Sequence, residues 1–254
     1  MRFFIGLIGI IGVSAVALAQ RVELSDSQAL AIGKRIWQNE CAGTVSGLTS
    51  WNKGEDFASL GIGHFIWYPK GKDGPFEESF PKLAAYLAAQ GKDVPKWMRG
   101  DCPWKTRAEF VADSDSARMR ELRNLLASTV PEQARFCAMR LEEALPKMLR
   151  AAPKDARAKV EKNFYRVANA PMGMYALIDY VNFKGEGVSP SERYKGRGWG
   201  LLQVLEAMPS TGDPMVAFSR AADEVLTRRV QNSPKDRNEA KWLPGWRNRV
   251  AGYR

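Results

Sequence analysis

The stretch from Gln38 to Tyr68 constrains the fold of this chain more than any other part of it. A helical pattern of apolar residues ends at Glu40, turn residues follow, and an apolar segment interrupted by glycines runs from Leu60 to Phe65. Short apolar runs bounded by glycine favour strands and turns over a continued helix. We therefore expect a helix that ends beside a small, glycine-rich β-hairpin, and residues 60–67 are the best candidate for a strand.

Acidic side chains gather in the same stretch. Glu40 stands at the end of the helical pattern, Glu55 and Asp56 lie among the turn residues, and His64, the only histidine, closes the glycine segment. Two carboxyl groups, one kept protonated by apolar neighbours and one ionised, suit cleavage of a glycosidic bond. Because 28 Asp and Glu are spread over 254 residues, an acidic pair near a turn is also ordinary surface. Spacing alone leaves both interpretations open.

The order of these residues resembles the active-site region of phage T4-type lysozymes. Glu40 is followed by a turn, an acidic loop and then Ser59-Leu60-Gly61-Ile62-Gly63-His64. In that family a helix-terminal glutamate precedes an aspartate-bearing hairpin, a threonine and an Ile-Gly-Ile-Gly-His segment. The resemblance implies that Glu40 is the general acid, that Ser59 takes the place of the threonine, and that His64 matches the family's histidine.

The chain departs from this pattern at the second carboxylate. Counting back from the histidine without gaps, the family's catalytic aspartate falls on Lys53, and the loop here is longer. Glu55 or Asp56 is therefore the candidate for that role. His64 has two possible roles, in substrate binding or as a hydrogen-bonded structural histidine at the base of the hairpin.

A second cluster of candidate residues lies between Asn182 and Pro209. Glycines at 185, 187, 196, 198 and 200 allow the backbone to turn tightly or to approach a ligand closely. Aromatic faces together with charged and amide groups are the side chains that bind sugars. The alternative is a glycine-rich connector between two helices. The substrate-binding candidates in this segment are Glu186, Tyr194, Arg197 and Gln203.

This segment resembles two further families. Tyr194-Lys195-Gly196-Arg197-Gly198 with Gln203 is similar to a segment of plant-type chitinases and related endolysins, and residues 200–203 with Met208-Pro209 are similar to a segment of lytic transglycosylases. These families share one lysozyme-like fold. The transglycosylase resemblance would make Glu186 the acid. We prefer Glu40, because it ends a well-formed helical pattern whereas Glu186 follows glycine in a loop.

The N-terminal residues and the net charge indicate where the protein acts. Residues 1–19 have an arginine at the start, an apolar core and an Ala-x-Ala site, which predicts a signal peptide and a periplasmic or secreted protein. The formal net charge of +10 favours polyanionic partners. Basic residues are scattered, which argues against a nucleic-acid groove, so we expect peptidoglycan glycan strands as the partner. After cleavage of the signal we expect no membrane span.

The cysteines and the lone histidine bear on disulfides and metals. An oxidising compartment permits one disulfide among Cys41, Cys102 and Cys137, and we favour the Cys102–Cys137 pair, although sequence alone does not choose among the three pairings. One histidine and scattered cysteines give no metal-ligand spacing, so we expect neither metal nor cofactor.

Caps and apolar periodicity predict most of the helices. The signals are a capping box at Ser25 and Gln28, Pro81 in a first turn, a capping box at Thr106 and Glu109, a break near 129–131, an apolar helix over 172–183, and Asp213-Pro214.

Together these observations predict an α+β, mainly helical chain in which residues 20–254 form one lysozyme-like catalytic domain with a small β-hairpin lobe. We expect a monomeric peptidoglycan-cleaving glycosidase, a muramidase that cuts between N-acetylmuramic acid and N-acetylglucosamine. A lytic transglycosylase or chitinase of the same fold, or a non-catalytic wall-glycan-binding protein, is the alternative.

Overall fold

The computed structural model describes residues 22–190 and 192–254. It is mainly helical with a small antiparallel sheet, as expected. The signal peptide predicted over 1–19 lies outside the described residues. In the part of the chain that is described, no helix combines the length and the apolar character needed to cross a membrane.

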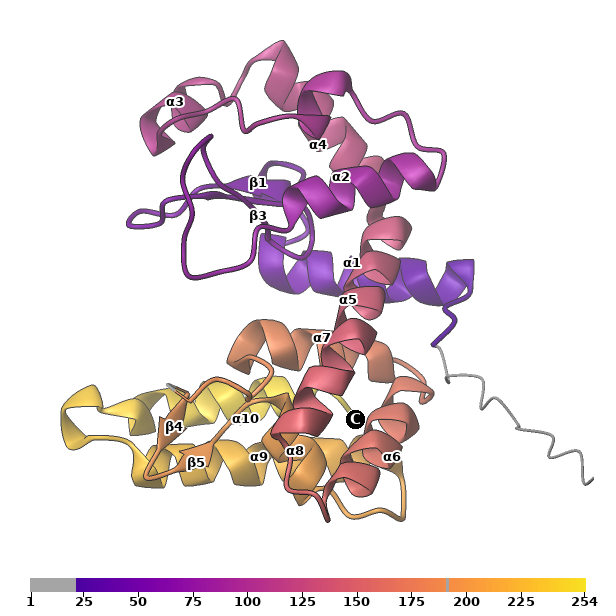
Figure 1. Cartoon of the computed structure of the whole chain (residues 1–254), viewed down its shortest axis with the longest axis vertical. Coiled ribbons are helices and arrows are strands. Elements are labelled where there is room, and N and C mark those ends of the chain that lie inside the picture. The colour runs from indigo at the N-terminus through magenta and orange to yellow at the C-terminus, as the bar shows by residue number, and fades with distance from the viewer. Residues whose placement is uncertain (1–21, 191) are drawn as a thin grey trace, which may run out of the picture.

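The elements form two lobes joined by one long helix (Figure 1). Helix α5 (Val130–Ala151) has 22 residues, about 33 Å at 1.5 Å per residue, and runs from one lobe into the other. Helix α1 (Asp26–Cys41) lies across it and makes the most extensive contact between any two elements. The two helices thus hold the end of α1, where Glu40 lies, between the lobes.

The first lobe contains the sheet and several short helices. These are η1 (Ser46–Leu48), β1 (Thr49–Ser50), β2 (Ala58–Leu60), β3 (Phe65–Trp67), α2 (Phe80–Ala89), η2 (Lys96–Arg99), α3 (Arg107–Ala112) and α4 (Ala117–Ser128).

The second lobe is built around a buried helix. Helix α7 (Gly173–Lys184) is buried along most of its length, which confirms the expectation for 172–183. The other elements are α6 (Arg157–Ala168), β4 (Arg193–Tyr194), β5 (Arg197–Gly198), α8 (Leu201–Ala207), α9 (Pro214–Asn232), η3 (Lys235–Arg237), η4 (Glu239–Trp242) and α10 (Leu243–Ala251).

The predicted helix starts are confirmed where a side chain caps the helix. The Ser25 hydroxyl accepts from the Gln28 N–H and the Gln28 side chain accepts from the Ser25 N–H, which is the expected capping box of α1. Asp213 accepts from the N–H groups of Met215 and Val216 at the start of α9. At its other end α1 stops at Ala42, whose φ of 52° is left-handed.

The glycine segment is a turn and not the continuous strand expected over 60–67. Strands β2 and β3 pair antiparallel with Leu60 opposite Phe65, so the four residues between them form the hairpin turn. Gly61 (φ 70°) and His64 (φ 48°) both have left-handed backbone, a conformation incompatible with a strand. A Cβ at Gly61 would lie 2.4 Å from the Gln133 Oε1, so helix α5 approaches this turn closely.

The expected Cys102–Cys137 disulfide is wrong, because all three cysteines are free thiols in the structure. Cys102 lies in the loop after η2, with its Sγ 3.5 Å from the Trp104 carbonyl oxygen. Cys137 lies in α5, where its Sγ would be 3.1 Å from a Cβ added at Gly63. The two cysteines therefore pack in different surroundings, each as a small apolar residue.

A buried glutamine fixes the glycine turn to α5. Gln133 is fully buried, and its Oε1 accepts from the Ile62 N–H at 3.0 Å. Its Nε2 donates to the Leu126 carbonyl at 2.6 Å and to the Thr129 hydroxyl at 3.1 Å. One amide thus satisfies polar groups of the hairpin and of the α4–α5 junction, which sets where His64 lies.

We expect Gln133→Leu to destabilise the protein by about 2–5 kcal/mol, since each buried polar group left unpaired costs about 1–3 kcal/mol. Urea unfolding followed by circular dichroism measures this. The control is Gln231→Leu at an exposed position of α9, expected within about 0.5 kcal/mol of the wild type. If Gln133→Leu were as stable as the control, apolar packing alone would hold the turn.

Candidate functional site

Glu40 lies in the last turn of α1 and has two side-chain partners. Its Oε1 accepts from the Arg249 Nη2 at 2.8 Å, and its Oε2 lies 3.8 Å from the His64 Nδ1. The Glu40 side chain is 20% exposed. The predicted acid is therefore oriented by two basic groups and stays accessible from solvent.

Arg249, from α10, also binds a buried aspartate in α7. Its Nε and Nη2 each donate to Asp179 at 2.8 Å, and the Tyr253 hydroxyl donates to the same carboxylate at 2.5 Å. Asn39, in α1, donates to Asp179 at 3.3 Å. The Asp179 side chain is 1% exposed, so this carboxylate supports the site from inside the protein and is shielded from a substrate. Four hydrogen bonds compensate its burial.

The guanidinium stays charged in this setting. Burial works to lower the pKa of Arg249, but hydrogen bonds and charge attraction from Asp179 and then from Glu40 raise that pKa overall. A permanently charged fork between two carboxylates fixes the position of both. The last turn of α1, the middle of α7 and the last turn of α10 meet at this one side chain.

A thiol lies near the second ring nitrogen of His64, the one that is not next to Glu40. The Cys41 Sγ is 3.7 Å from the Gly61 carbonyl oxygen and 3.9 Å from the His64 Nε2. Burial, followed by the negative charge of Glu40, raises the pKa of Cys41 to about 12. The thiol is therefore protonated at neutral pH and is no nucleophile. It packs as a neutral neighbour that holds the imidazole in place.

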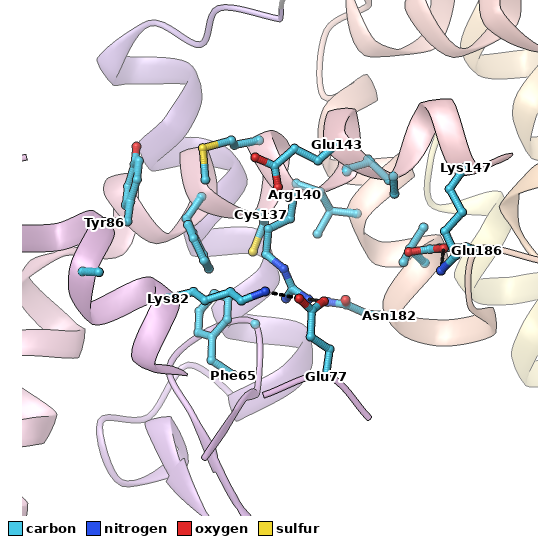
Figure 2. A pocket seen from close by; sticks show the side chains of 18 residues that line it. Phe65, Glu77, Lys82, Tyr86, Cys137, Arg140, Glu143, Lys147, Asn182 and Glu186 are labelled. Carbon is cyan, nitrogen blue, oxygen red and sulfur yellow. Dashed lines mark hydrogen bonds and ion pairs between the residues drawn. The ribbon is translucent and has the colours of Figure 1, made fainter. Parts of the chain in front are cut away.

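A groove of about 680 Å³ opens next to the histidine turn (Figure 2). Gly63 and Phe65, the two neighbours of His64 in sequence, line it, together with parts of α2, α5 and α7. Glu40 does not line this groove; it lies near His64, which is part of the turn that does. The volume of the groove is in the range of ligand sites in proteins. The apolar wall includes Tyr86, Phe136, Leu141, Ile178 and Val181.

Charged side chains cross the groove as ion pairs. Glu77 accepts from Arg140 at 3.2 Å and also pairs with Lys82, and Figure 2 shows these three side chains converging. Lys147 donates to Glu186 at 2.9 Å at the other end. The groove therefore offers both signs of charge along an apolar wall.

Glu186 has a second acid beside it. Burial, followed by the charge of Glu186, raises the pKa of Glu192. A Cβ at Gly185 would lie 3.0 Å from a Glu192 carboxylate oxygen, so the glycine makes room for that carboxyl group. Two acids, one with a raised pKa, are the kind of pair that acid–base chemistry uses.

The other predicted residues of the glycine-rich loop have structural contacts. Gln203 accepts from the Gly200 N–H at 3.0 Å and donates to the Gly187 carbonyl at 3.1 Å, which closes the loop onto the start of α8. The Tyr194 hydroxyl donates to Glu239 at 2.8 Å. Arg197 is exposed in β5. Only Glu186 of this group lines the groove.

The structure keeps the hairpin candidates apart from Glu40. Ser59 is buried in β2, and its carbonyl accepts from the Ser50 hydroxyl. Glu55 lies in the β1–β2 loop, where its Oε1 accepts from Asn52 at 3.2 Å and its Oε2 is buried without a hydrogen-bond partner. Asp56 is exposed. Within the described residues, neither Glu55 nor Asp56 contacts Glu40.

Sequence reasoning missed Asp179, Arg249 and Tyr253. One signal was present: Asp179 is the only acid in the apolar segment 172–183, and a carboxylate in a buried helix needs a basic or hydrogen-bonding partner. Which partner it takes is a tertiary question. Among the described residues, no group of three or more His, Cys, Asp or Glu is placed to hold a metal ion.

Comparison of the chain with protein-family models, with curated proteins and with solved structures found no match. The assignment of function therefore depends on the residues and on their geometry.

Cations and aromatic rings alternate behind the glycine-rich loop. The Arg229 guanidinium lies 4.1 Å from the centre of the Trp199 ring and donates to both oxygens of Glu239 at 2.8 and 2.9 Å. The Lys184 Nζ lies 3.4 Å from the centre of the Trp246 ring. Burial, and then the Arg229 charge, lower the pKa of Lys184 from 10.5 to about 7.

The Arg249 contacts predict a large and selective loss of stability. Arg249→Ala leaves the Asp179 carboxylate buried without its charge partner, with only the Tyr253 and Asn39 hydrogen bonds, which costs about 3–5 kcal/mol. Arg247→Ala, on the same helix, removes an exposed pair with Asp223 and is expected to cost about 0–1 kcal/mol. Urea unfolding measures both. Adding Asp179→Asn to Arg249→Ala should recover part of the loss; a double variant no more stable than the single one would contradict the buried-charge explanation.

Lys184 predicts a pH-dependent stability. Folded Lys184 releases its proton near pH 7, whereas the unfolded chain keeps that proton until about pH 10.4. Between these two pH values the unfolded state binds more protons than the folded state, so the stability of the fold rises with pH. We expect the free energy of unfolding to increase by roughly 1–2 kcal/mol from pH 7 to pH 9 relative to Lys184→Met. If the free energy of unfolding changed with pH in the same way in both proteins, the prediction for Lys184 would be wrong.

Proposed function

We propose that this protein is a peptidoglycan-cleaving glycosidase with a lysozyme-like fold, in which Glu40 is the general acid. The observation that carries the proposal is the position of Glu40. Its carboxylate is held by Arg249 at the end of α1, beside His64, and the turn that bears His64 forms part of the wall of the groove.

In the proposed reaction Glu40 protonates the oxygen that bridges two sugars, and the bond from that oxygen to the anomeric carbon breaks. A water, or a hydroxyl of the sugar itself, then adds to the anomeric carbon, and the proton it loses returns to the Glu40 carboxylate. Arg249 holds Glu40 in one orientation, and His64 limits its movement on the other side. Positioned general acids contribute typically ~10²–10⁴-fold to the rate.

Glu55 is the better candidate for the second carboxylate. Its unpartnered buried oxygen is a polar group that lacks compensation in the free protein, while Asp56 is exposed to solvent. The role remains a prediction for both, because neither contacts Glu40. A transglycosylase would need no second acid, since the hydroxyl of the sugar is the nucleophile.

The charges of the groove support peptidoglycan over chitin as the substrate. Chitin is neutral, whereas peptidoglycan carries carboxylates and amines on its peptide stems. Arg140, Lys82 and Lys147 are held by Glu77 and Glu186 along an apolar wall, and such pairs match a substrate of mixed charge. The signal-like N-terminal segment supports action in the periplasm or outside the cell.

Glu186 gives the second candidate, a transglycosylase in which Glu186 is the acid. The observation that favours it is that Glu186 itself lines the groove and has Glu192 beside it, whose pKa is raised. Glu40 remains preferred, because Glu186 is paired with an exposed lysine whereas Glu40 is held by a half-buried arginine that also bonds to Asp179.

The matched variants Glu40→Gln and Glu186→Gln separate the two candidates. Incubated with purified sacculi, the wild type and Glu186→Gln should release soluble muropeptides, and Glu40→Gln should release them at least ~10²-fold more slowly. Circular dichroism and urea unfolding check that both variants are folded. Mass spectrometry of the products distinguishes hydrolysis from transglycosylation, because an anhydro end lacks one water.

Two results would overturn this assignment. If Glu186→Gln were inactive and Glu40→Gln active, the acid would be Glu186. If the wild type bound sacculi as well as Glu40→Gln does and neither released any product, the protein would be a non-catalytic wall-glycan binder.

A further inference from the structure

The β4–β5 hairpin and the 3₁₀ segments before α10 lie at the same end of the second lobe (Figure 1). The Tyr194 hydroxyl donates to Glu239 at 2.8 Å, which joins the hairpin to η4. Arg229 binds the same carboxylate from α9. We call the exposed basic side chains of these segments, with Trp242, the basic face; its residues are Arg193, Lys195, Arg197, Lys235, Arg237, Lys241 and Trp242.

Among residues 22–190 and 192–254, the six cations of the basic face have no ion-pair partner. Within the described residues none of their side chains makes a hydrogen bond or a salt bridge. Arg193 has only a charge interaction with Glu206, and Arg237 one with Tyr194. Asp236 is the exposed acid of the two segments, since Glu239 is buried and neutralised by Arg229. By contrast, Arg229, Arg247 and Arg249, close by in the same lobe, are all paired.

An exposed indole lies within this cationic surface. Trp242 is 56% exposed, and the Lys241 Nζ lies 5.1 Å from the centre of its ring. The tryptophans of the neighbouring cluster, Trp199 and Trp246, are packed by contrast. Indole rings favour the boundary between lipid headgroups and acyl chains, and basic side chains are attracted to anionic headgroups. An exposed tryptophan among free cations therefore has the chemistry of a membrane interface.

We propose that the basic face docks on an anionic lipid bilayer. Binding is peripheral: the cations contact phosphate headgroups and Trp242 enters the interface. A soluble polyanion would satisfy the cations equally well, but it offers no apolar layer for the exposed indole, so the bilayer fits the whole surface better. This inference does not depend on the proposed glycosidase activity, because it uses none of the groove residues and neither candidate acid.

Vesicle co-sedimentation tests the proposal with the full chain. The probes are vesicles of phosphatidylglycerol with phosphatidylcholine in equal parts, and vesicles of phosphatidylcholine alone. The test variant is Lys195→Gln, Lys235→Gln, Lys241→Gln. The control variant is Lys34→Gln, Lys72→Gln, Lys105→Gln, which removes the same charge from exposed lysines elsewhere.

We expect binding to the anionic vesicles only. Each cation at such a surface contributes about fivefold to partitioning, so the test variant should bind on the order of 100-fold more weakly. The control variant should bind as the wild type does, and Trp242→Ser should weaken binding with the cations intact. Raising the salt should weaken binding for every variant, since it shortens the Debye length.

Three outcomes would overturn the proposal. Equal loss in the test and control variants would show a net-charge effect with no defined face. Equal binding to both kinds of vesicle would exclude anionic lipid as the ligand. Binding to dextran sulfate as tight as to the anionic vesicles, with no effect of Trp242→Ser, would make the ligand a soluble polyanion.

Discussion

The candidate site depends on one guanidinium placed between two carboxylates. Arg249 bonds to Asp179, which is buried, and to Glu40, which is accessible. Asp179 alone would make the interior of the second lobe unstable, since an uncompensated buried charge is costly. The need to neutralise Asp179 brings α10 against α7. The Arg249 Nη2, which already donates to Asp179, then also donates to Glu40. One interaction thus links the stability of the second lobe to the orientation of the predicted acid.

Local features of the structure followed from the sequence, and the reason is physical. The Ser25 and Asp213 side chains cap residues only two or three positions away, so both caps can be predicted from a short stretch of sequence. The glycine segment was misread as a strand, because the left-handed backbone at His64 depends on the approach of α5. Alternation with glycine is compatible with a strand and with a turn. Only the packing partner decides between them.

Non-local pairings were beyond what the sequence could predict. Glu40 was identified by its place at the end of a helix, but no residue near Glu40 in the sequence indicates that Arg249 is its partner. The favoured disulfide failed for a related reason: cysteine counts restrict the possible pairings and do not bring thiols together. The ion pairs of the groove join α5 to segments far away in the chain, and the composition alone does not say which acid pairs with which base.

The separation of Glu40 and Arg249 along the chain has a consequence for how the molecule assembles. The two residues are 209 positions apart, so their contact closes a very long loop, and we expect it to form late in folding. Helix α1 and the sheet can form earlier from nearby residues. Until α10 docks, the carboxylate of Glu40 lacks the group that orients it. We therefore expect the site to be assembled only after the second lobe has formed around its buried charge.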